Sequence, residues 1–198
     1  MKGLSKEVPW PGARCGWIEV YNKNSDANFA RYIKSIVDAK MLEVCSTTLP
    51  QKVLPAIFTH PQYAAYLQSR RDAYKARAEV AHKAIRTIPG VSLVKPSGAF
   101  YLTVTFDDFT LTLGQTLPIQ NAGARTITEK RVAGFLPHQM DKRFAYYLMA
   151  AYGLCVVPLS GFNTTLQGFR MTLLEEDATV FEKTLAILAE AIPAYLKS

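Results

Sequence analysis

A long helical repeat in the middle of the chain constrains the fold more than any other part of the sequence. Within residues 61–88, apolar side chains recur at steps of four, three, four and three residues, which is the period of one helix face. These side chains are Tyr74, Ala78, Ala81, Ile85 and Ile88. Pro89 and Gly90 then end the helix, because proline lacks an amide proton and glycine favours a turn. A helix of this length must bury its apolar stripe, so the neighbouring segments are expected to supply a core.

Strand patterns and further helices flank that helix. Residues 100–106 alternate apolar and polar side chains, which predicts a strand with one buried face. The end of the chain predicts a helix with an apolar stripe made of Phe181, Leu185, Leu188, Ile192 and Tyr195. The other expected elements are strands at 15–21, 153–158 and 168–174 and helices at about 29–41, 48–58 and 144–152. This mixture predicts an α/β fold.

Residues 107–141 lack clear periodicity and contain Gly, Pro, Thr and Asn. Such a composition is typical of an irregular segment that crosses the surface. We therefore expect a mobile loop without a buried stripe. A lid over a substrate site is the alternative interpretation.

Composition and charge bound the kind of protein. Hydrophobic residues make up 49% of the 198, which is enough for a sizeable core, and the net charge is +7. Because the basic residues are dispersed, solvated helix faces explain the charge better than a nucleic-acid surface does. No apolar run reaches the roughly 18 residues that a membrane span requires. The prediction is a protein that binds neither nucleic acid nor membrane.

The cysteines and histidines are few and scattered. Cys15, Cys45 and Cys155 form no Cys-x-x-Cys pair, and the three histidines lie far from one another in the sequence. This pattern predicts no metal site and favours a reducing compartment, namely the cytoplasm.

The beginning of the chain has a pattern with chemical meaning. Lys6 ends the run Gly3-Leu4-Ser5-Lys6, and Arg14 stands eight positions later in Pro11-Gly12-Ala13-Arg14. A lysine amine can form a Schiff base with an aldehyde cofactor, and a planar guanidinium can hold its phosphate through two hydrogen bonds. A solvated surface lysine and an arginine in a strand-edge ion pair are the alternative interpretations.

This lysine and arginine pattern resembles the lysine signature of class I/II aminotransferases, which are fold type I pyridoxal-phosphate enzymes. Residues 95–101 are similar to the first strand of that family's small domain, and residues 153–174 to its later strand, Gly/Ser-rich turn and arginine-bearing strand. In the family the lysine lies past the middle of a longer chain. The resemblance therefore implies the C-terminal half of such an enzyme. Residues 1–70 would be the end of the large cofactor-binding domain and the start of the interdomain helix, and residues 71–198 an α+β small domain with an insertion at about 107–141.

The resemblance also implies roles for single residues. Lys6 is expected to be catalytic, because one amine both tethers pyridoxal 5'-phosphate and moves a proton. Ser5 and Arg14 are expected to bind the cofactor together with Lys6, and Arg170 to bind the α-carboxylate of the substrate. An exposed strand arginine is the alternative interpretation of Arg170. Gly3 stands where aspartate aminotransferases use a serine for the phosphate, so only its backbone is expected to contribute.

The implied activity is transfer of an amino group between an amino acid and a 2-oxo acid by a homodimeric full-length enzyme. Residues 40–50 contain no arginine, whereas aspartate aminotransferases carry a side-chain-selecting arginine in this region, so the expected substrate is neutral or aromatic. The family's ring-binding residues lie upstream of this chain, so the fragment alone is expected to be inactive. The alternatives are a pyridoxal-phosphate lyase or synthase of the same fold and a non-enzymatic, degenerate transferase module.

Overall fold

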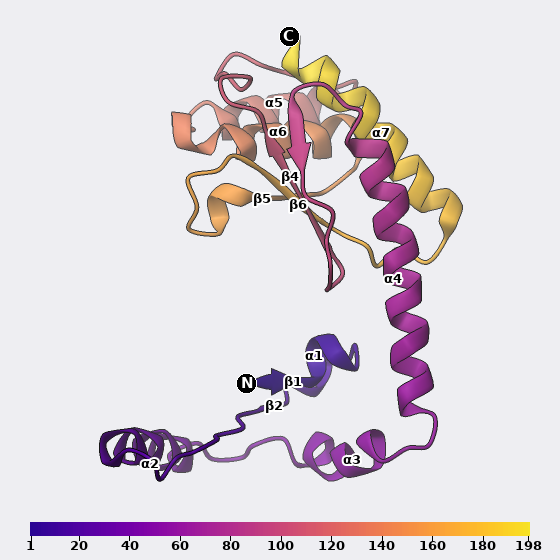
Figure 1. Ribbon diagram of the computed structural model, residues 1–198. Helices are drawn as coiled ribbons and strands as arrows, with labels where there is room; N and C mark the ends of the chain where they lie inside the picture. The colour runs from indigo at the N-terminus through magenta and orange to yellow at the C-terminus, as the bar shows by residue number, and fades with distance from the viewer. The chain divides into compact units, whose positions relative to one another are not determined.

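The computed structural model describes residues 1–198, which form two compact units (Figure 1). The first unit comprises Met1–Leu67 and the second comprises Gln68–Ser198. The division falls within helix α4 (Tyr63–Ile85), close to the boundary predicted at residue 70. Helix α4 is the long helix expected within residues 61–88. That the two units are a large-domain remnant and a small domain remains a prediction.

The first unit contains short strands and three further helices. Strands β1 (Lys2–Gly3) and β2 (Gly16–Trp17) pair antiparallel, and helix α1 (Leu4–Glu7) and the 3₁₀ turn η1 (Pro11–Ala13) lie between them in the chain. Helices α2 (Ala27–Met41) and α3 (Thr48–Phe58) follow. The strand expected at 15–21 is wrong in length. Because β1 offers only two residues for pairing, residues 18–21 have no partner strand.

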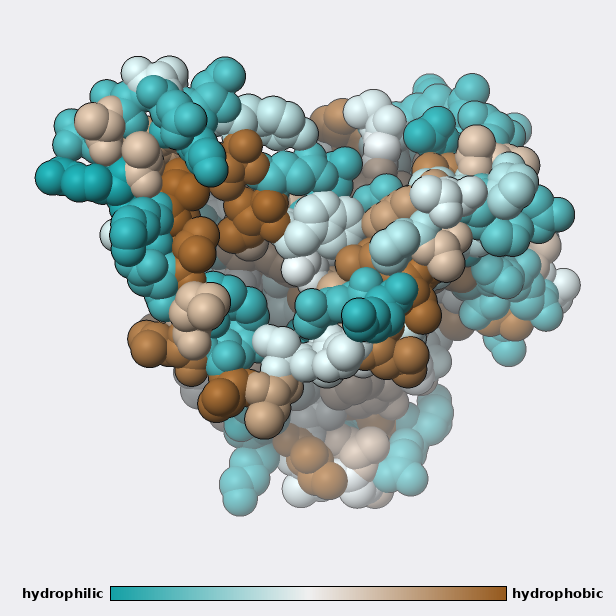
Figure 2. Space-filling view, turned by 90° about the horizontal axis from the view of Figure 1, so that it is seen from below, coloured by the Kyte–Doolittle hydropathy of each residue, from teal (hydrophilic) through white to brown (hydrophobic).

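Helix α2 exposes apolar side chains. It begins where the Asp26 carboxylate accepts a hydrogen bond from the Phe29 amide at 2.7 Å. None of its residues is buried, and the apolar side chains of Tyr32, Val37 and Met41 are largely exposed. Figure 2 shows groups of apolar side chains among hydrophilic ones on the face seen from below. The apolar side of α2 is therefore not part of a core within the first unit.

The second unit is a four-stranded antiparallel sheet with helices packed on it. The strand order is β3 (Val91–Leu93), β4 (Tyr101–Phe106), β6 (Gly168–Thr172) and β5 (Val157–Pro158). Its other helices are α5 (Ala122–Val132), α6 (Met140–Tyr152) and α7 (Ala178–Leu196), and its 3₁₀ turns are η2 (Pro137–Gln139) and η3 (Leu159–Gly161). Helix α5 packs against α6, and α6 packs against both the sheet and α7 (Figure 1).

The core of the second unit follows the two periodicities seen in the sequence. Along β4, Leu102, Val104 and Phe106 are buried, whereas Thr103 between them is exposed. All five stripe residues of α7 are buried, as are four of the five stripe residues predicted within 61–88, namely Ala78, Ala81, Ile85 and Ile88, the last of which lies beyond the end of α4. The helix and strand faces that pack on each other are therefore those that the sequence predicts.

Residues 107–141 contain a helix and contribute to this core, which corrects the expectation of a loop without a buried stripe. They contain α5 and η2, and Leu111, Leu117, Ile119 and Val132 are buried. The sequence hides this burial because α5 turns only Thr128 and Val132 inward, one helical turn apart. The remaining buried side chains come from irregular backbone, which has no period to detect.

The strand expected at 153–158 is also wrong in length. Gly153 ends α6 with a φ of 70°, and its amide donates to the Met149 carbonyl, so the residues that follow first leave the helix. Pairing begins only at Val157 and Pro158, which lie opposite Arg170 and Phe169 of β6. Strand β6 itself ends two residues before the predicted limit of 174.

We expect Gly168→Ala to lower the free energy of unfolding by about 3 kcal/mol, because a methyl group has no space there. A Cβ atom at Gly168 would lie 2.2 Å from the Val104 carbonyl oxygen and 2.8 Å from the Thr105 Cα atom. Gly134→Ala is the matched control, since a Cβ atom there meets nothing within 4 Å. Urea unfolding followed by circular dichroism measures both variants. Equal midpoints for the two would show that β4 and β6 separate easily to admit the methyl group.

Candidate active site

The predicted lysine and arginine of the first unit lie on one closed loop. Gly3 pairs with Gly16, and the Leu4 amide donates to the Cys15 carbonyl at 3.0 Å, so the two ends of the loop are tied together. Gly16 permits this approach, because a Cβ atom there would lie 3.0 Å from the Lys2 carbonyl oxygen. Leu4 is fully buried and fixes α1. The loop is therefore anchored at its start, although termini commonly fray.

Ser5, Lys6 and Arg14 present three different groups on this loop. Ser5 is partly buried, while the side chains of Lys6 and Arg14 are exposed. Arg14 has a φ of 46°, a left-handed conformation that is uncommon for arginine. Its Nη1 atom donates to the Pro11 carbonyl at 3.0 Å, which leaves the remaining guanidinium donors available. Arg14 forms no ion pair, so the strand-edge ion pair is not what the structure contains.

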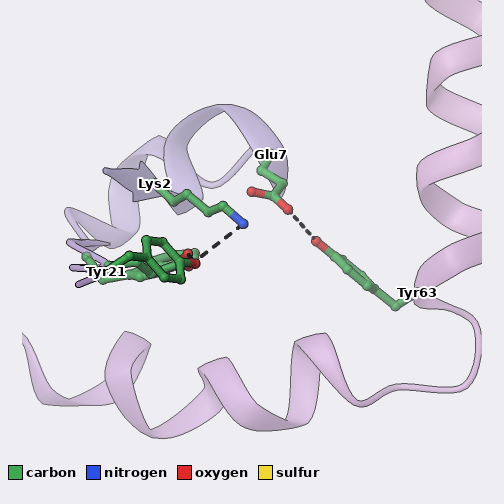
Figure 3. A network of polar contacts seen from close by, with 6 residues as sticks. Lys2, Glu7, Tyr21 and Tyr63 are labelled. Carbon is green, nitrogen blue, oxygen red and sulfur yellow. Dashed lines mark hydrogen bonds and ion pairs between the residues drawn. The ribbon is translucent and has the colours of Figure 1, made fainter.

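Two polar contacts connect the loop and the strand before it to neighbouring segments (Figure 3). The Tyr63 hydroxyl, at the start of α4, donates to the Glu7 carboxylate at 3.0 Å. Lys2 lies 3.8 Å from Glu19, which also accepts hydrogen bonds from the Tyr21 hydroxyl at 2.7 Å and the Trp17 indole at 3.0 Å. The hydrogen bond from Tyr21, followed by that from Trp17, lowers the pKa of Glu19. Glu7, which directly follows Lys6, thus ties the lysine segment to α4.

The contact between Glu7 and Tyr63 predicts a pH dependence at alkaline pH. Burial, and then the hydrogen bond to Glu7, raise the pKa of Tyr63 to about 12, above the value of about 10 in an unfolded chain. The folded state therefore favours the neutral phenol, and the stability that this contributes is complete below pH 10 and lost as the pH rises to 12. The difference between the phenolate absorbance titrations of wild type and Tyr63→Phe should show one group titrating near 12. Glu7→Gln should lower that value; an unchanged titration would contradict the contact.

Arg170 occupies the sheet of the second unit and contacts two aromatic rings. It lies on β6 opposite Thr103 of β4 and Val157 of β5. Its Cζ atom is 4.2 Å from the ring centroid of Tyr101 and 4.3 Å from that of Phe162. The side chain is partly buried and forms neither an ion pair nor a hydrogen bond. The edge of the guanidinium, which carries its N–H donors, is thus available to a carboxylate.

A buried carboxylate is hydrogen-bonded to the strand that carries Arg170. Asp141 is fully buried at the start of α6. It accepts hydrogen bonds from the Ser160 amide at 2.7 Å and the Ser160 hydroxyl at 2.6 Å. The amides of Lys142 and Gly168 also donate to it, at 2.7 and 3.5 Å. One side chain thus joins α6, η3 and the first residue of β6.

The structure brings some of the predicted site residues together. Ser5, Lys6 and Arg14 share one loop of the first unit, and Arg170 stands on a strand of the second. Their roles remain predictions. The sequence interpretation missed Glu7, Tyr101, Phe162 and Asp141 as site residues. Only Glu7 has a sequence signal, namely its position beside Lys6.

The chain has the fold of part of an aminotransferase. A solved structure of an alanine aminotransferase from Pyrococcus furiosus superposes on 98% of this chain and 41% of its own, with a TM-score of 0.64 and 23% identity. This likeness confirms the predicted fold class, an α/β part of the pyridoxal-phosphate transferase fold. No helix is both long and apolar enough to cross a membrane.

The sequence comparisons identify the family. The family model for aminotransferase class I and II matches residues 1–192, so the chain belongs to the class I and II aminotransferases. An uncharacterised aminotransferase of Methanocaldococcus jannaschii is 45% identical over 203 residues, which is 100% of this chain and 45% of the relative. An alanine aminotransferase 2-like protein of Danio rerio is 28% identical over 82% of this chain and 28% of its own length. The chain thus spans less than half the length of these relatives.

Proposed function

We propose that this chain supplies the C-terminal half of an aminotransferase that moves an amino group between an amino acid and a 2-oxo acid with pyridoxal 5'-phosphate. Membership in the class I and II aminotransferases supports the reaction class. The observation that carries the proposal is the closed loop on which the Lys6 amine and the Arg14 guanidinium stand together. The absence of arginine at residues 40–50 supports a neutral or aromatic substrate.

The residues of the loop fit the cofactor chemically. An aldehyde with a phosphate group needs a primary amine and a planar cation, and Lys6 and Arg14 provide them from exposed positions. The guanidinium of Arg14 is not neutralised by a carboxylate, so it retains its charge for a phosphate. Ser5 adds a hydroxyl from the same loop. These three residues would hold the cofactor.

Each residue then has one task. When bound, the cofactor withdraws electrons from the substrate α-carbon, which makes its proton removable. The Lys6 amine accepts that proton and returns one, as a general base and then a general acid. Arg14 and Ser5 hold the phosphate in place, and Arg170 binds the α-carboxylate that all amino acid substrates share.

Further features of the proposal concern the whole protein. The chain alone is inactive, because a complete site needs the ring-binding residues of the missing half. The full-length enzyme is a homodimer in the cytoplasm that binds neither nucleic acid nor membrane. The three free thiols of Cys15, Cys45 and Cys155 support a reducing compartment. The apolar side of α2 supports assembly, since another part of the protein or a second subunit would cover it.

The test is an assay of the full-length protein with pyridoxal 5'-phosphate and a panel of amino acids, with and without a 2-oxo acid. We expect new amino acid to form only when the 2-oxo acid is present, with neutral or aromatic donors preferred. Release of ammonia or loss of a carbon fragment without a 2-oxo acid would indicate the lyase or synthase. No turnover with any donor, despite correct folding, would indicate a degenerate module.

A further inference from the structure

The guanidinium of Arg170 contacts two aromatic rings. The two ring centroids at 4.2 and 4.3 Å belong to Tyr101 and Phe162, and no carboxylate or carbonyl oxygen contacts the N–H groups. A ring face attracts the cation but offers no acceptor for its N–H donors. The rings thus hold the guanidinium in place and leave its N–H groups to bind an anion.

The two rings are positioned by different means. Tyr101 belongs to β4, where it pairs with Thr172, so it is the diagonal neighbour of Arg170 on the same face of the sheet. Phe162 is not on a strand. It follows η3, its amide donates to the Leu159 carbonyl at 2.7 Å, and 42% of its surface is exposed. The sheet orders Tyr101, but Phe162 needs another anchor.

Asp141 provides that anchor. Its fully buried carboxylate accepts from both the amide and the hydroxyl of Ser160, two residues before Phe162. The same carboxylate accepts from the amide of Gly168, two residues before Arg170. Gly168 lets the turn come close, because a Cβ atom there would lie 3.0 Å from the Leu159 Cδ1 atom. One side chain therefore fixes the segment that carries the ring and the strand that carries the arginine.

We propose that Asp141, Tyr101 and Phe162 are positioning residues for Arg170. Asp141 holds the η3 turn against β6, and the two rings then present the guanidinium edge to the substrate carboxylate. This inference rests on the proposed role of Arg170 as the carboxylate-binding residue. It adds to that role the device that orients the arginine without neutralising it.

The test uses the full-length protein with Phe162→Leu, Phe162→Tyr, Asp141→Asn and Arg170→Gln. Phe162→Leu removes the ring from an exposed position, so folding is retained, and Asp141→Asn replaces an acceptor with an amide whose N–H₂ faces the Ser160 donors. We expect both to raise the KM for amino acids on the order of tenfold, with the absorbance of bound cofactor unchanged. Phe162→Tyr retains a ring, so its KM should stay within about threefold of wild type.

Two further measurements separate orientation from loss of stability. Leu188→Ala removes a buried side chain of α7 and is the control for destabilisation alone, so its KM should stay near that of wild type. The Nε proton of Arg170, observed by NMR in the chain itself, should lose the contribution of the Phe162 ring to its ring-current shift in Phe162→Leu and Asp141→Asn and keep it in Phe162→Tyr, while the contribution of Tyr101 remains in all three.

The outcomes distinguish this inference from the proposed function. A raised KM in Arg170→Gln, together with an unchanged KM and Nε shift in Phe162→Leu and Asp141→Asn, overturns the positioning role alone. An unchanged KM in Arg170→Gln overturns the proposed role of Arg170 and this inference with it.

Discussion

Replacing Lys6 with alanine in the full-length protein is expected to abolish covalent cofactor binding and to reduce amino-group transfer on the order of 10³-fold or more. The reason is that one amine serves both as tether and as proton carrier, so no other group on the closed loop substitutes for it. Ser5 offers a hydroxyl and Arg14 a permanently charged guanidinium, and neither forms a carbon–nitrogen double bond with an aldehyde. Absorbance of the bound cofactor and the transfer rate measure the two effects.

Lys52→Ala is the matched control for this variant. Lys52 is an exposed lysine of α3 in the same unit, and it forms no ion pair with the loop. It should bind the cofactor and turn over as wild type does. If Lys6→Ala kept the absorbance of the bound cofactor, the tether would be a different lysine.

Arg170→Gln is expected to raise the KM for every amino acid substrate on the order of 100-fold, because it removes a bidentate, charge-assisted contact to the shared α-carboxylate. The cofactor absorbance should be unchanged, since cofactor binding is proposed to depend on Ser5, Lys6 and Arg14. Steady-state kinetics with several amino acids measures the effect. Arg125→Gln, an exposed arginine on α5 of the same unit, is the control.

Two results would contradict the assignment of Arg170. Loss of cofactor with retained substrate affinity would place the arginine in the cofactor site. An effect on one substrate only would make it a side-chain selector, because the α-carboxylate is common to all of them.

Much of the fold could be predicted where burial is periodic. The stripes of α4 and α7 and the alternation along β4 repeat over several turns or residue pairs, and their buried residues are those that the patterns indicate. The lengths of short elements could not be predicted from periodicity. Strands β2 and β5 each pair over only two residues, and α5 buries only two side chains. Neither case leaves a period in the sequence.

The residues of the candidate site also differ in how far the sequence predicts them. That Lys6 and Arg14 lie on one loop could be predicted because their positions are close in sequence. Asp141 could not be found, since its acceptor role depends on donors 19 and 27 residues away that are mainly backbone amides. The same holds for the rings around Arg170, which meet only through the register of β4 with β6 and the turn after η3.

The central claim is that Lys6 binds pyridoxal 5'-phosphate covalently, and borohydride reduction tests it most directly. Reduction converts a lysine–cofactor double bond into a stable single bond, and peptide mass mapping then locates the modified lysine. Our account predicts that full-length protein reduced in the presence of the cofactor carries the added mass on the peptide with Lys6, and that addition of amino acid before reduction removes it. Modification spread over several exposed lysines, or confined to one other than Lys6, would contradict the account.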